Sequence, residues 1–165
     1  MNPYERRHIE TAIDLALEAE RGGNLPIGAV IAIGEDAIAA GANSMLSPQY
    51  DPGRHAEIEA LRNVPAELWP RTAEMTCYTT LEPCVMCFGT LLLHGVGRIV
   101  FGAVDRQGGA SPVLAHLPPY YLGDSAAGRV PEWIGPVAPA ECGPLYERAA
   151  KLFDGTLAAI MRGDK

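Results

Sequence analysis

Two short stretches of the chain combine residue types that bind metals and move protons. One reads H-x-E over residues 55–57, and the other reads P-C-x-x-C over residues 83–87, at the start of an apolar run. Two thiolates and one imidazole give zinc three protein ligands and leave the fourth tetrahedral position for water. Bound zinc lowers the pKa of that water, and a carboxylate outside the ligand set can then move protons. The candidate zinc ligands are therefore His55, Cys84 and Cys87, with Glu57 as the proton carrier.

The spacing of these residues predicts two helices whose first turns meet at the metal. Pro83 favours the start of a helix, and Cys84 and Cys87 then lie one turn apart on one face. The positive end of a helix also favours thiolates. A second helical run, residues 54–63, follows the turn-forming Asp51-Pro52-Gly53 and carries His55.

A Cys-x-x-Cys pair has other interpretations when it stands alone. It occurs in redox pairs and as half of a structural zinc site, although a structural site normally has four protein ligands. The pattern offers no clear fourth ligand, since Cys77 lies in a strand-like run and Cys142 is distant in sequence. The combined motifs favour a catalytic zinc. A non-catalytic structural-zinc module remains the alternative from another class, and it leaves Glu57 unexplained.

Length and composition predict one domain over residues 1–165, because a chain of this size, 48% hydrophobic, can bury a core of its own. The net charge is −7 and only Lys151 and Lys165 are lysines, which is unfavourable for general binding to phosphate backbones. Four cysteines, two of them in the metal motif, indicate a reducing, cytoplasmic environment. Neither a signal peptide nor an apolar run of bilayer-spanning length is recognisable, so no membrane partner is expected.

The remaining periodicity predicts an α/β fold with three layers, α/β/α, around a five-stranded mixed sheet. The expected hairpin, residues 28–33 and 37–42, is antiparallel, and the later crossovers are parallel. The metal would lie at the carboxyl end of the sheet. The other expected elements are helix 3–21, helix 54–63, strand 75–80, helix 84–94, strand 98–103, a short strand within 133–138 and helix 141–162. Trp69-Pro70 is expected in a loop.

Three residues outside the metal motifs are candidates for substrate contacts. Asn43 ends the second strand close in sequence to His55, where it is either a turn former or a ligand for a base. The segment 104–131 is rich in Gly, Pro and Ser, and a loop of this length is usually functional or mobile. Its Tyr120 and Tyr121 either stack on a substrate or pack the loop against the protein.

These segments resemble the cytidine deaminase superfamily, in particular the branch of bacterial tRNA adenosine deaminase, cytosine deaminase and guanine deaminase. The resemblance covers most of residues 5–105 and returns at 129–153. It is carried by residues 25–30, Asn43, residues 51–52 and 55–58, residues 78–87 and residues 97–105.

The resemblance implies a cytidine-deaminase-like fold with Zn²⁺ held by His55, Cys84 and Cys87, and with Glu57 shuttling protons. It also implies a homodimer whose subunits help to build each other's sites. The residues expected to contact substrate are Asn43, Ala56, Pro83, Tyr120 and Tyr121.

The chain departs from the tRNA enzymes at positions away from the metal. His94-Gly95-Val96, Ser44-Met45 and Ala127-Gly128 stand where those enzymes typically have basic or polar residues, and the tail after Phe153 lacks a basic cluster. With the negative charge, this favours a hydrolytic deaminase of a small nucleobase, nucleoside or related heterocycle that releases ammonia. A tRNA-specific adenosine-to-inosine deaminase is the alternative. The Pro119–Tyr121 loop and the C-terminal helix are the candidate lid.

Overall fold

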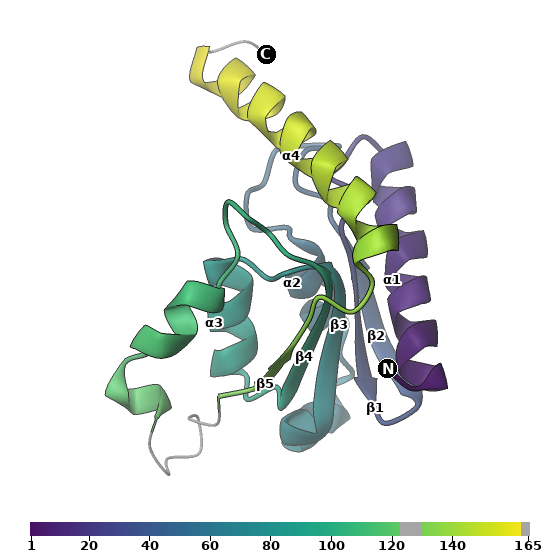
Figure 1. Cartoon of the computed structure of the whole chain (residues 1–165), viewed down its shortest axis with the longest axis vertical. Helices are drawn as coiled ribbons and strands as arrows, with labels where there is room; N and C mark the ends of the chain where they lie inside the picture. Colours follow the sequence, from purple (N-terminus) through teal and green to yellow (C-terminus); the bar gives the residue numbers. More distant parts are fainter. Residues whose placement is uncertain (123–129, 163–165) are drawn as a thin grey trace.

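A computed structural model of the chain describes residues 1–122 and 130–162. Figure 1 shows a central sheet with the strand order β2-β1-β3-β4-β5 between two layers of helices. The strands are β1 (Gly28–Ile33), β2 (Asp36–Ala42), β3 (Met75–Leu81), β4 (Arg98–Ala103) and β5 (Glu132–Ile134). The helices are α1 (Pro3–Arg21), α2 (Ala56–Arg62), α3 (Val85–Leu93) and α4 (Pro139–Arg162). The predicted three-layer fold with a five-stranded mixed sheet is confirmed.

The sheet is mixed because β1 runs against both of its neighbours. It pairs with β2 and with β3 in antiparallel fashion, whereas β3 with β4 and β4 with β5 are parallel. The carboxyl ends of β3 and β4 therefore meet at one edge of the sheet. The chain leaves that edge at Glu82 and at Val104, which brings the segment before the cysteines next to the segment after β4.

Side chains of the three central strands point alternately to the two faces of the sheet, and each face has its own hydrophobic core. Register partners Ile31, Cys77 and Ile99 pack with α2 and α3, and the adjacent partners Val30, Tyr78 and Val100 pack with α1 and α4. Successive side chains of a strand point to opposite faces. Because both faces are covered, these strands are buried at nearly every position.

Particular residues explain where α1 begins and how closely α2 packs against the sheet. Asn2 and Glu5 form a reciprocal capping box at the start of α1, which satisfies two otherwise unpaired backbone donors. Gly41 of β2 lets α2 approach closely, since a Cβ there would lie 2.3 Å from the backbone nitrogen of Ala60. The predicted helix over residues 3–21 is confirmed.

Several predicted boundaries were wrong. Trp69-Pro70 lies in a 3₁₀ segment, η1 (Ala66–Glu74), because Trp69 packs against the α2/α3 core instead of extending into solvent. The last strand ends at Ile134, since Gly135-Pro136 follows and proline has no N–H for the ladder.

The segment 104–131 also contains regular structure, namely the 3₁₀ turns η2 (Ser111–His116) and η3 (Pro119–Tyr121). Ala127-Gly128 lies outside the described residues. Among the helices that the structure describes, none is both long and apolar enough to cross a bilayer.

Candidate metal centre and active site

The starts of α2 and α3 bring the three predicted metal ligands together. His55 is the N-cap residue of α2, and Cys84 is the N-cap residue of α3. Nδ1 of His55 lies 3.6 Å from Sγ of Cys84 and 3.5 Å from Sγ of Cys87. All three donor atoms lie within 4.8 Å of one another. The convergence of two helix N-termini, expected from the spacing of the motifs, is therefore present.

The donor set and its geometry fit a zinc ion. Tetrahedral zinc with Zn–S near 2.3 Å and Zn–N near 2.0–2.1 Å holds a nitrogen and a sulfur ligand about 3.6 Å apart. The observed separations of 3.6 and 3.5 Å agree with this value. Three protein ligands leave one coordination position, which is the arrangement of catalytic zinc sites.

Hydrogen bonding distributes the protons of this cluster unequally. The hydrogen bond from Cys87 is the main cause that lowers the pKa of Cys84 to about 4, and the same bond, with burial, raises the pKa of Cys87. Burial alone would lower the pKa of His55, but its hydrogen bond with Cys84 and the charge of Glu57 outweigh burial and raise it. The cluster therefore holds protons that a metal would displace on binding.

Glu57 is a buried carboxylate beside the ligands, with only 3% of its surface exposed. Its Oε1 accepts a hydrogen bond from Thr79 Oγ1 at 3.3 Å, and its Oε2 accepts one from Cys87 Sγ at 3.4 Å. Burial raises its pKa. The carboxyl group lies in the first turn of α2 and borders both the metal cluster and a cavity.

This cavity has a volume of about 310 Å³ and is lined mainly by apolar side chains. Its polar wall contains His55, Glu57, Glu82, Cys84, Asp105 and Gln107, and its apolar wall includes Leu25, Ile27, Met45 and Leu81. One stripe of α4, with helical spacing, closes the cavity through Tyr146, Ala149, Ala150 and Phe153. The described lining includes three carboxylates and neither lysine nor arginine.

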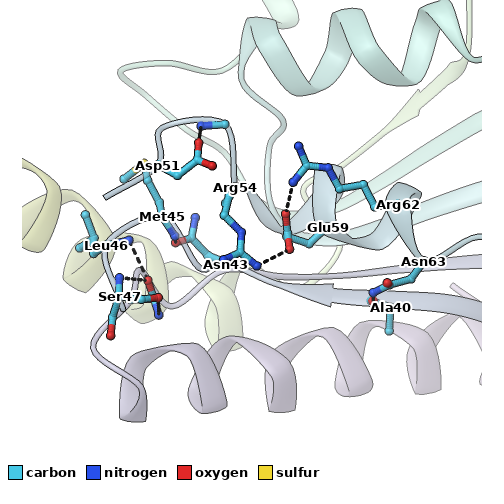
Figure 2. A network of polar contacts seen from close by, with 12 residues as sticks. Ala40, Asn43, Met45, Leu46, Ser47, Asp51, Arg54, Glu59, Arg62 and Asn63 are labelled. Carbon is cyan, nitrogen blue, oxygen red and sulfur yellow. Dashed lines mark hydrogen bonds and ion pairs between the residues drawn. The ribbon is translucent and has the colours of Figure 1, made fainter. Parts of the chain in front are cut away.

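Asn43 lies at the start of the loop that leads to His55, and this loop is held by local polar contacts (Figure 2). Asn43 is 1% exposed; its Oδ1 accepts from the Met45 amide at 3.2 Å, whereas its buried Nδ2 has no hydrogen-bond partner. Such an orphaned donor is costly unless a ligand or water satisfies it. Asn43 itself is not part of the described cavity lining, but Met45 is.

The end of the same loop is fixed to α2 by charged groups. Arg54 donates to Glu59 at 2.9 Å, and Arg62 donates to the other oxygen of Glu59 at 2.7 Å. Figure 2 shows the Glu59 carboxylate between the two guanidinium groups. Because Arg54 directly precedes His55, this arrangement fixes the backbone from which the imidazole extends.

The other predicted substrate contacts lie outside this cavity. Ala56 is fully buried in the α2/α3 core, and Pro83 is buried with its carbonyl accepting from the Ala110 amide at 2.9 Å. Tyr121 packs against the α2/α3 core, and the neighbouring Tyr120 is 57% exposed. The structure does not bring the tyrosine pair to the cavity of the same chain.

Several cavity residues were not predicted to contact a substrate. Glu82 and Asp105 follow the carboxyl ends of β3 and β4, and only the strand order brings them together. Glu82 directly precedes Pro83, so its place in the motif was a usable signal. The C-terminal helix was predicted as part of a lid, but its residues Ala149 and Phe153 were not named as cavity residues, because a stripe that lines a cavity has the same helical spacing as one that fills a core.

Comparison with known proteins places this fold and site in a family. Residues 3–103 match the family model described as the cytidine and deoxycytidylate deaminase zinc-binding region. The chain therefore belongs to the cytidine and deoxycytidylate deaminases, a family whose members are hydrolytic, zinc-binding enzymes.

Individual relatives carry different names within this family. The chain is 36% identical over 138 residues to the tRNA-specific adenosine deaminase of Bacillus subtilis, a match that covers 82% of each protein. It is 40% identical over 104 residues to the enzyme of that name from Buchnera aphidicola, covering 62% of this chain and 64% of the relative. With the cytosine deaminase of Candida albicans, the identity is 31% over 98 residues, which are 59% of this chain and 65% of the relative.

Two solved structures that resemble this chain also come from deaminases with different substrates in their names. A structure from a study of A-to-I editing by tRNA:A34 deaminases superposes with a TM-score of 0.69 at 27% identity, covering 85% of this chain and 99% of that one. The guanine deaminase from Nitrosomonas europaea superposes with a TM-score of 0.64 at 25% identity, covering 90% and 85%.

Proposed function

We propose that residues 1–165 form one zinc-dependent deaminase domain that hydrolytically removes an exocyclic amino group from a small nucleobase, nucleoside or related heterocycle. The observation that carries this choice of substrate is the cavity beside Glu57. Its volume of about 310 Å³ and its largely apolar walls suit a flat heterocycle. Its described lining has three carboxylates but neither lysine nor arginine, so apart from the metal site its side chains offer no cationic partner to a phosphate.

In this proposal, each residue near the metal has a separate task. His55, Cys84 and Cys87 would hold zinc, which would supply a water of lowered pKa. Glu57 would carry a proton from the attacking water to the departing amino group, so that a C–O bond replaces the C–N bond and ammonia leaves. The Thr79 hydroxyl donates a hydrogen bond to the Glu57 carboxyl group and restricts its orientation.

Asn43 lies outside the described lining but close in the loop to Met45, which is part of it. In this proposal the unpartnered Nδ2 of Asn43 donates to a ring nitrogen or carbonyl of the base. The α4 stripe closes one side of the cavity and excludes water from the reaction. We assign this lid function to α4, which is the half of the predicted lid that borders the cavity.

The resemblance to the family predicts a homodimer, and in a homodimer Tyr120 and Tyr121 could reach the cavity of the other subunit. Tyr120 and Tyr121 lie away from the cavity of their own chain, so a contact with substrate requires a neighbouring subunit. We propose that the protein is a homodimer in which this pair supports the neighbouring site, whereas Ala56 and Pro83, which are buried in their own chain, support the site of that chain. Sedimentation velocity on the wild type and on Tyr120→Ala/Tyr121→Ala, with activity per chain, tests this assignment. A monomeric, fully active protein would refute it.

A tRNA-specific adenosine deaminase is the second candidate, because the Bacillus, Buchnera and tRNA:A34 relatives carry that description. An ammonia-release screen separates the two candidates. It includes cytosine, guanine, adenine, their nucleosides, aminated triazines and pterins, and a tRNA anticodon stem-loop. We expect release from a free heterocycle or nucleoside. Turnover of the stem-loop alone would favour the second candidate, and zinc binding without any turnover would favour a structural module.

A further inference from the structure

Glu82 is a second buried carboxylate beside the cavity, and its role differs from that of Glu57. It is 3% exposed. One oxygen accepts from the Asp105 amide at 3.2 Å, and the other accepts from both the amide, at 3.0 Å, and the hydroxyl of Ser111. A carboxylate that accepts several hydrogen bonds is an anchor for the groups that donate them. Here these donors stand at the two ends of one loop, residues 105–111.

The same loop is joined to the metal-binding segment by backbone contacts. The Ala110 amide donates to the Pro83 carbonyl at 2.9 Å, and Gly109 forms a bridge with Cys84. A Cβ at Gly109 would lie 2.5 Å from the Glu82 carboxyl carbon, so this approach requires glycine. The Ser111 hydroxyl also accepts from the Trp133 indole at 3.0 Å, which extends the network to β5.

Packing alone does not fix this loop. Its residues Asp105, Gln107 and Gly108 form one wall of the catalytic cavity. Glu82, Asp105 and Gln107 also line a second pocket of about 360 Å³. Because this wall borders two pockets, fewer side chains pack against it than against a core segment, and its hydrogen bonds matter more for its position.

We propose that Glu82 is a positioning residue for substrate binding, which fixes the wall formed by residues 105–108 at the distance that the substrate requires. This inference rests on the proposed function, because it concerns the same cavity. Glu82 acts through the loop and does not move the reacting protons. Its loss therefore weakens substrate binding more than it slows the chemical step.

The test uses Glu82→Gln in the zinc-loaded, full-length protein. The amide keeps one acceptor oxygen but turns an NH₂ group towards Asp105 N or Ser111 N, so one end of the loop loses its anchor. The matched control is Glu5→Gln, which removes another buried, hydrogen-bonded carboxylate near the opposite end of β4. Ser111→Ala is the second variant, because it removes one donor without changing a charge.

In Glu82→Gln we expect KM to rise by about tenfold or more, with kcat within about threefold and zinc content unchanged. The Ser111→Ala change should raise KM in the same direction, and the double variant should be no worse than Glu82→Gln alone. In Glu5→Gln, KM should stay at the wild-type value even if the melting temperature falls. An unchanged KM in Glu82→Gln, or an equal rise in Glu5→Gln, would overturn the proposal.

Amide hydrogen exchange provides a readout that does not depend on turnover. In Glu82→Gln, exchange should accelerate at the amide of Asp105 or of Ser111, whichever faces the new NH₂ group, and stay unchanged in β3. Slow exchange at both amides would refute the positioning role whatever the substrate is. If the wild type deaminates nothing in the panel while exchange behaves as expected, the proposed function fails and the anchoring role stands.

Discussion

The hydroxyl of Thr79 donates a hydrogen bond to Oε1 of Glu57 at 3.3 Å, which links the central strand β3 to the first turn of α2. Thr79 is fully buried and Glu57 nearly so. A carboxyl group that transfers protons must keep one oxygen directed at the reacting atoms. The Thr79 contact leaves the second oxygen beside Cys87 and the metal cluster.

Replacing Thr79 with Val removes this hydrogen bond while nearly preserving the side-chain shape. We expect kcat per bound zinc to fall by about three- to tenfold, because the carboxyl group of Glu57 loses one orienting contact. Zinc content should not change. Steady-state kinetics with metal analysis checks this, with Thr76→Val at the other end of β3 as the control. Equal activity in the two variants would contradict the orienting role.

Replacing Glu57 with Gln should abolish turnover and preserve the metal site. The amide cannot accept a proton from water or deliver one to the leaving amino group, so kcat should fall by at least about 10³-fold. Metal analysis and thermal unfolding should match the wild type, since Glu57 is not a ligand. Turnover close to normal would show that another group transfers the protons.

Replacing Cys84 or Cys87 with Ala should remove zinc and stability together. The wild type should contain about one zinc per chain, and its melting temperature should fall on treatment with a strong chelator, because metal binding is linked to folding. In the two variants, the chelator should have little further effect. Cys142→Ala, which alters a buried cysteine on the α1/α4 side of the sheet, is the control and should retain the metal. A full zinc content in Cys84→Ala would rule out the ligand assignment.

The ionised Glu59 carboxylate should raise the free energy of unfolding near neutral pH, and this contribution should disappear in acid. Its hydrogen bond with Arg54 is the largest cause that lowers its pKa below the ordinary 4.5. The contribution is therefore complete above about pH 4.5 and is lost as the pH falls through the lowered pKa. At pH 7, Glu59→Gln should cost about 0.5–1 kcal/mol.

Urea unfolding at several pH values, with a chelator present throughout, measures this difference without a contribution from metal loss. Wild type and Glu59→Gln should converge as the pH falls below about 4.5. Glu74→Gln, which removes a more exposed partner of Arg71, should have a smaller effect at pH 7. A difference that grows on acidification would contradict the assignment.

The sequence was sufficient for the fold and for the metal cluster because both depend on local patterns. The β-favouring runs 28–33 and 75–80 and the amphipathic run 3–21 are local patterns that indicate buried strands and a half-buried helix. The H-x-E and P-C-x-x-C motifs specify ligands through helix starts, and His55 and Cys84 are in fact N-cap residues.

The rest of the site depends on contacts between distant segments, which no local pattern encodes. Glu82 meets Ser111 across 29 positions of the chain, and the α4 stripe reaches the cavity only because α4 packs beside α1 and over the carboxyl end of the sheet (Figure 1). Tyr120 and Tyr121 were predicted as substrate contacts because they are aromatic residues in a long loop. Tyr121 instead packs against the α2/α3 core.

The most direct test of the account compares kcat/KM for the best free heterocycle or nucleoside with kcat/KM for an anticodon stem-loop, each at low and at moderate salt. A small neutral substrate makes no phosphate contacts, so we expect its kcat/KM to exceed that of the stem-loop and to change little with salt. Efficient inosine formation in the stem-loop that weakens steeply as salt rises, with the free heterocycles and nucleosides inert, would contradict the account and identify a tRNA-editing enzyme.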